Sequence, residues 1–134
     1  VSEEGIVPAH EYYKLAALRV TSETGTQPTA RVVMNVGDAE VVAEVSGDGP
    51  VDAVFKAIER MAGAKAQMLL YSVNAITGGT DAQGEVTVRL QHEGRIVNGL
   101  GADTDIIVAS AKAYINALNR LHGGVERLNP QLAA

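Results

Sequence analysis

Several residue types are missing or scarce in this chain of 134 residues. There is no Cys and no Trp, and Tyr and Phe together number only five. Without Cys there is no disulfide framework, no zinc–thiolate site and no Cys nucleophile. The sequence is that of one globular domain whose core is built from small aliphatic side chains rather than aromatic rings.

Basic residues are also sparse, and they occur singly rather than in clusters. Lys and Arg total 11 against 16 acidic residues, which gives a formal net charge of −5. Nucleic acids and anionic membranes attract basic surfaces, so we expect neither as a partner. The longest apolar stretch, residues 106–121, is interrupted by Ser110, Lys112 and Asn116 and is therefore not a membrane span.

No catalytic pattern is present in the sequence. The three histidines fall in different contexts, and no Ser occupies a G-x-S-x-G turn. Asp52, Asp103 and Asp105 lie where acidic side chains cap helix N-termini, which is their simplest role. We therefore expect no catalytic residue, no metal site and no cofactor in this domain.

What the sequence does contain is a repeated change of hydrophobic period. Residues 15–21, 29–36 and 40–45 alternate as strands, and a helical stripe then runs from Pro50 to a cap at Gly63. The order recurs with strands at 68–76, 85–91 and 95–100, followed by a helix over 104–121 that ends at Gly123-Gly124. The predicted fold class is α+β: two pseudo-symmetric βββα units, each a small, mostly antiparallel sheet with one covering helix.

The domain organisation follows from these patterns. Residues 1–12 have linker composition, the two units span 13–63 and 64–123 of a domain over 13–127, and 128–134 form a tail. Because the chain starts at Val1 rather than Met, we expect it to be cut from a longer protein. A three-stranded sheet is marginal alone, so each unit must pack on the other or on another chain.

Glycine-rich turns join a strand to a helix at two places, residues 47–50 and 99–103. Such corners present backbone N–H groups to a small anion, for example an amino-acid carboxylate. Neither is a nucleotide fingerprint, because the Walker lysine and the third Gly of G-x-G-x-x-G are absent. From the residues alone two interpretations stay open: a ligand corner, or a tight turn that needs Gly only for its backbone angles.

Three long motifs resemble a known family: GDGPVDAVFKAI (47–58), YSVNAITGGTDAQGEVTVRL (71–90) and GADTDIIVASAKAYINALNRL (101–121). They are similar, in the same order, to the C-terminal regulatory domain of 2-isopropylmalate synthases. The resemblance implies a cytoplasmic, leucine-sensing, homodimerising module that follows a linker and a catalytic barrel. In that family the whole enzyme condenses acetyl-CoA with 2-oxoisovalerate, and leucine inhibits it by feedback.

The same resemblance implies a leucine pocket in this chain. The matching positions are Gly47, Asp48, Gly49, Val51, Asp52, Met68, Tyr71, Ala75, Ala82, Gly84 and Ile106. We expect the leucine carboxylate at the N–H groups of residues 49–52 and its ammonium near Asp48 or a strand carbonyl. Its isobutyl group is expected against Val51, Ala75, Ala82 and Ile106. Two alternatives remain open: an isoleucine-sensing domain of a citramalate synthase, and a purely structural dimerisation domain.

Overall fold

The computed structural model describes residues 11–63, 65–76 and 83–133, the side chains of 75, 76 and 124–133 excepted. The first unit contains β1 (Tyr13–Thr21), β2 (Thr29–Val36), β3 (Ala39–Ser46) and α2 (Pro50–Ala62). The second contains β4 (Gln67–Ile76), β5 (Gln83–His92), β6 (Arg95–Asp103) and α3 (Ile106–Ala133). The predicted α+β fold of two βββα units is therefore confirmed.

Each unit forms its own antiparallel sheet, ordered β1-β2-β3 and β4-β5-β6. Both second hairpins turn within two residues. In the first of these hairpins Gly37 has a φ of 62°, and in the second both Glu93 and Gly94 have positive φ. These backbone conformations match the hairpin signals in the sequence at Gly37-Asp38 and Gly94. Gly63 caps α2 in the left-handed conformation, with a φ of 71°, as its position predicted.

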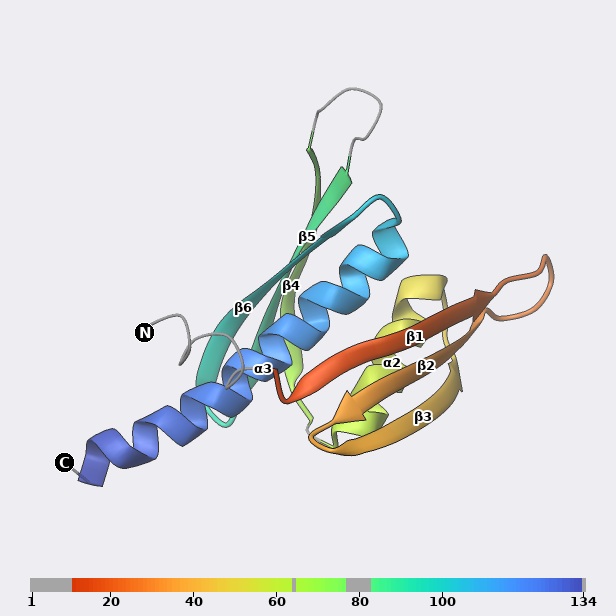
Figure 1. Ribbon diagram of the computed structural model, residues 1–134. Helices are drawn as coiled ribbons and strands as arrows, with labels where there is room; N and C mark the ends of the chain where they lie inside the picture. The colour runs from red at the N-terminus through yellow and green to blue at the C-terminus, as the bar shows by residue number, and fades with distance from the viewer. Residues whose placement is uncertain (1–10, 64, 77–82, 134) are drawn as a thin grey trace.

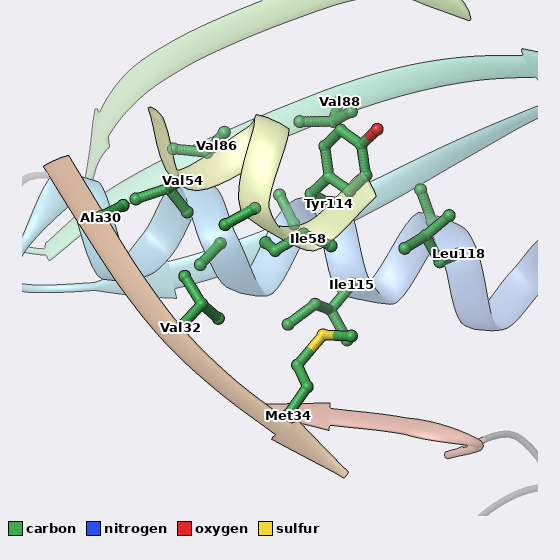
Figure 2. Packing of buried hydrophobic residues seen from close by; sticks show 14 of the residues in the cluster. Ala30, Val32, Met34, Val54, Ile58, Val86, Val88, Tyr114, Ile115 and Leu118 are labelled. Atoms are coloured by element: carbon green, nitrogen blue, oxygen red, sulfur yellow. The ribbon is translucent and has the colours of Figure 1, made fainter. Parts of the chain in front are cut away.

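The two helices lie between the two sheets, so the units share one core (Figure 1). Figure 2 shows Val32 and Met34 of β2 on one side of the helices, and Val86 and Val88 of β5 on the other. The buried cluster joins all of these layers. Its largest fully buried side chains are Met34, Ile58, Leu90, Val32, Val54, Val86 and Val88.

Alternation along the strands places side chains as the sequence predicted. Val86, Val88 and Leu90 are fully buried against the helices. On the helical stripe of α2, Val54 and Ile58 are likewise buried. The period of two in strands and about 3.6 in helices therefore decides which face meets the core.

Several element ends differ from the predictions by one to three residues, and the end of the last helix differs by more. β6 continues to Asp103 instead of ending at Leu100. The last helix begins at Ile106 and runs to Ala133, so the prediction that it ends at Gly123-Gly124 is wrong. A glycine inside a helix costs only about 1 kcal/mol relative to Ala, which does not end a helix whose preceding turns are held by the core.

Candidate functional site

The first glycine-rich corner joins β3 to α2 and contains five of the expected site residues. Gly47 is buried, and its N–H donates to the Pro28 carbonyl at 3.1 Å. A Cβ at Gly47 would lie 2.6 Å from the Ala53 nitrogen and from Asp52 Oδ2, so only glycine fits this corner. Asp52 accepts the Asp48 N–H at 2.9 Å and pairs with Lys56 at 3.1 Å.

Asp52 stabilises the corner by accepting the N–H of Asp48, which precedes the helix, and does not cap an N–H group of α2 as its position predicted. The hydrogen bond from the Asp48 N–H, together with Lys56, holds the pKa of the Asp52 carboxyl below its usual range. Gly49 is the N-cap residue of α2, and no side chain caps the helix there. First-turn N–H groups of α2 are thus without a side-chain cap and carry the positive end of the helix dipole.

The equivalent corner before α3 is closed by its own carboxylates. Asp105 Oδ1 accepts the Ile107 N–H at 2.8 Å, and Asp103 Oδ2 accepts the Asp105 N–H at 2.9 Å. Lys112 pairs with Asp103 at 3.1 Å. The bond from the Asp105 N–H, with Lys112 beside it, lowers the pKa of Asp103. The predicted capping role is confirmed for Asp105, whereas Asp103 bonds the N–H of Asp105 just before the helix. Of the two corners only the one at α2 keeps an uncapped N-terminus.

A second group of expected residues meets where β4, β5 and α3 converge. The Tyr71 hydroxyl and Ser110 Oγ are 2.7 Å apart, and Ser110 Oγ also donates to the Ile106 carbonyl at 2.8 Å. A Cβ at Gly84 would collide with the Ile106 side chain, so these two residues are in direct contact. The Phe55 ring lies edge-on to the Tyr71 ring, with centroids 5.6 Å apart.

We call this group, Phe55, Tyr71, Gly84, Ile106 and Ser110, the junction. It is bordered by exposed apolar surface on the helix-facing side of β4, where Val73 keeps 45% of its surface exposed. Phe55 lies one helical turn after Val51 and links the junction to the corner at α2. The fold therefore brings an uncapped helix N-terminus and an apolar, partly open surface onto connected elements.

Three expected residues are placed differently or not at all. Met68 packs against the shared core and pairs with Leu90, on the far side of a β-bulge from Tyr71. Ala75 lies on β4 opposite Gly84, with its side chain outside the description. Ala82 falls outside the described residues.

Sequence reasoning missed two residues of the junction. The helical period predicts Phe55 only as part of the apolar stripe of α2, and Ser110 only as an interruption of an apolar stretch. A signal was available for Ser110, because it is a small polar residue on a helix face otherwise made of Ile107, Ala111 and Tyr114. Ser110 is fully buried, which requires a hydrogen-bond partner.

Neither a metal-binding cluster nor a membrane-spanning helix is found in the described part of the chain. Within it, no group of three or more His, Asp or Glu side chains is arranged to hold a metal ion. Among the described helices, none is long and apolar enough to cross a membrane. His92 Nδ1 lies 2.9 Å from the Lys65 carbonyl and His122 stacks on Tyr12, whereas His10 is outside the description.

Comparison with known proteins agrees with this architecture. A family model described as "LeuA allosteric (dimerisation) domain" matches residues 1–122. The chain is 61% identical over 132 residues to 2-isopropylmalate synthase of Aromatoleum aromaticum, and 60% identical over 131 residues to that of Dechloromonas aromatica. Identity to the Nitrosomonas europaea protein of the same name is 58% over 132 residues.

Each of these alignments covers 98% of this chain and 26% of the relative. The chain thus spans about a quarter of the length of the curated relatives it matches. By the family match over residues 1–122, the chain belongs to the LeuA allosteric (dimerisation) domain family.

Proposed function

We propose that this domain binds L-leucine between the α2 corner and the junction, and that it dimerises as the regulatory part of a cytoplasmic 2-isopropylmalate synthase. The observation that carries the proposal is the difference between the two helix N-termini. Asp105 caps α3, whereas no side chain caps α2. A carboxylate supplied by a ligand would complete the α2 N-terminus.

The rest of the amino acid has matching surroundings. Asp48 is exposed beside the uncapped turn and is available to an ammonium group. Apolar surface for a branched side chain comes from Val51 and Ile106, with Ala75 and Ala82 proposed as further lining. The paired hydroxyl groups of Tyr71 and Ser110 line the proposed leucine site on the side of β4 and α3.

The parent reaction and its control are part of the same proposal. The relatives are named 2-isopropylmalate synthase, and we infer that a catalytic barrel joined through a linker condenses acetyl-CoA with 2-oxoisovalerate. Leucine bound here would inhibit that enzyme by feedback. Coupling of this kind requires that leucine bind two states of the whole enzyme with different affinity.

Calorimetric titration of the chain with leucine, isoleucine and valine tests the ligand. We expect leucine to bind most tightly, with a preference over valine of about 1–3 kcal/mol for the additional methylene. At a hundredfold excess over its dissociation constant, leucine should stabilise the fold by about 2.7 kcal/mol. Tighter binding of isoleucine would favour the citramalate synthase alternative, and no heat with any of the three would favour a purely structural dimerisation domain.

A further inference from the structure

The two separate sheets leave four edge strands, β1, β3, β4 and β6. An edge strand presents unpaired N–H and C=O groups that pair readily with another strand. Natural proteins protect such edges with charged side chains, bulges or covering groups. The four edges of this fold are protected very unequally.

Helix α3 supplies side chains that cover two of the edges. Asn119, only 7% exposed, accepts the Tyr13 N–H at 2.8 Å and donates to the Tyr13 carbonyl at 2.9 Å. Both backbone groups at the start of β1 are thereby satisfied. On β6, the Leu100 N–H donates to Asn116 Oδ1 at 3.0 Å.

Charged residues protect β1 and β6 further, and they also protect a third edge strand, β3. β1 carries Lys14 and Arg19, and β6 begins at Arg95 and ends at Asp103. β3 carries two exposed glutamates, Glu40 and Glu44. A second strand laid along any of these edges would meet charge.

β4 has none of these features in its central and last part. Its ten residues, QMLLYSVNAI, contain no charged side chain and no proline. The single bulge lies between Met68 and Leu70, so residues 71–76 form a regular stretch paired with β5 on one side only. Among the described residues, half of the exposed large apolar side chains lie on this strand: Leu69, Leu70, Tyr71 and Val73.

The exposed apolar side chains of β4 lie on both faces of the strand. Leu70 pairs with Arg89 on the face away from the helices, and Val73 pairs with buried Val86 on the face toward them. A neighbouring strand would therefore bury apolar surface above and below the sheet as well as pairing the backbone. Such an edge is the signature of a strand that is completed by another chain.

We propose that β4 pairs antiparallel with β4 of a second copy about a two-fold axis, joining two three-stranded sheets into one six-stranded sheet. An antiparallel pair of identical strands is compatible with two-fold symmetry. Because β4 carries no charged side chain, two copies of it can pair without like-charge repulsion. The family description as a dimerisation domain identifies the occupant as a second copy. The inference rests on the dimerisation in the proposed function and assigns its surface.

Charge insertion tests the surface. Leu70→Lys and Val73→Lys should each weaken the dimer at least about tenfold in sedimentation equilibrium, because each places two equal charges near the axis. Ile96→Lys on β6 and Val42→Lys on β3 are matched controls at exposed apolar positions and should leave the dimer unchanged. Circular dichroism of all four variants reports whether the fold is retained.

A single-cysteine scan provides a second measurement that does not depend on destabilisation. The chain has no native Cys, so cysteines placed one at a time from 69 to 74 are each alone. Residues facing their own copy in an antiparallel pair have Cα atoms about 4.5–5.5 Å apart, within disulfide range. Oxidation should give covalent dimers that peak sharply at one β4 position, with little product for Val42→Cys.

The outcomes separate the two proposals. A wild-type chain that stays monomeric at every concentration overturns the proposed dimerisation and with it this surface. A dimer that is weakened by Ile96→Lys or Val42→Lys, or that is indifferent to both β4 lysines, overturns the β4 pairing alone. Leucine titration of Leu70→Lys, whose side chain lies on the face away from the helices, tests ligand binding separately from the dimer.

Discussion

Glycine residues in this domain differ in what limits their replacement. A Cβ at Gly99 would collide with the Ala113 carbonyl and lie 2.5 Å from the Ala117 nitrogen, both in the backbone of α3. Gly101 meets α3 backbone in the same way. At Gly84 the nearest atoms belong to the end of the Ile106 side chain, which is able to rotate. Gly99 and Gly101 therefore serve helix–sheet packing, whereas Gly84 shapes the junction.

Substitution of Gly84 separates binding from folding. Gly84→Ala should displace the Ile106 side chain and weaken the proposed leucine binding by roughly tenfold or more. A misplaced methyl group in an apolar pocket changes the binding free energy by about 1–3 kcal/mol. Gly84→Ala should lower the free energy of unfolding by about 1 kcal/mol, whereas Gly99→Ala should lower it by about 3 kcal/mol or more. Calorimetry with leucine and urea unfolding measure the two effects. Undiminished leucine affinity in Gly84→Ala would remove Ile106 from the pocket.

Tyr114 makes stability depend on alkaline pH. Burial raises the pKa of its hydroxyl to about 12, with Glu59 contributing, against 10.0 for an ordinary tyrosine. The unfolded chain therefore loses this proton first, so the stabilisation is complete below pH 10 and is lost as pH rises toward 12. The loss should reach roughly 2–3 kcal/mol.

The Tyr114→Phe variant isolates this contribution. Urea unfolding between pH 8 and 11.5 should show a shallower decline for the variant than for the wild-type chain. Parallel declines would mean that other groups, not Tyr114, determine the alkaline sensitivity.

At the scale of elements, α3 connects the parts of the domain. Its first turns hold Tyr71 through Ser110, and more than two turns later Asn119 holds β1 through both backbone groups of Tyr13. Tyr12, immediately before β1, stacks on His122 with ring centroids 4.1 Å apart. One helix thus contacts the junction near its N-terminus and the first strand further along.

Loss of the Asn119 amide should release the start of β1. Asn119→Ala removes two hydrogen bonds from a buried position, which should cost about 1–3 kcal/mol of unfolding free energy. Amide hydrogen exchange at Tyr13 should accelerate with no comparable change in β5. Asn116→Ala, which removes one exposed bond to Leu100, is the matched control and should cost less than about 1 kcal/mol. Equal effects of the two variants would contradict a specific role of Asn119.

At the scale of the whole molecule, the helices between the sheets make the two units interdependent. Phe55 of α2 packs on Tyr114 of α3 with ring centroids 4.9 Å apart. Figure 2 places Ile115 of α3 beside Met34 of β2, so residues of the second unit complete the core of the first. The sheet of the first unit therefore packs on helices of both units, and Phe55 of α2 reaches Tyr71 on the sheet of the second unit.

This arrangement predicts a single cooperative unfolding transition. Ile58→Ala, which opens a cavity at a fully buried position of α2, should cost about 2–5 kcal/mol. Hydrogen exchange protection should fall by the same free energy in β2 and in β5, although Ile58 belongs to the first unit. Protection lost in β2 alone would show that the units unfold separately.

Local order was predictable because its causes are local. Alternating residues in β2 and β5, the two hairpin turns and the Gly63 cap each depend on neighbours within a few positions. The same holds for the carboxylates before α3, which bond N–H groups two residues away. The end of α3 was not predicted, because the free energy that glycine costs in a helix is smaller than the free energy gained by packing the rest of that helix on the core.

By itself the sequence determined the element types and their order, the buried face of each strand and helix, and the family to which the chain belongs. Only the tertiary structure decided that both helices lie between the sheets, that Ser110 supports Tyr71, that Asn119 holds Tyr13 and that β4 is the uncharged open edge. Those contacts join residues 39 and 106 positions apart. Periodicity reports the neighbours of a residue along the chain, whereas contacts between distant segments are chosen by how all the layers pack at once.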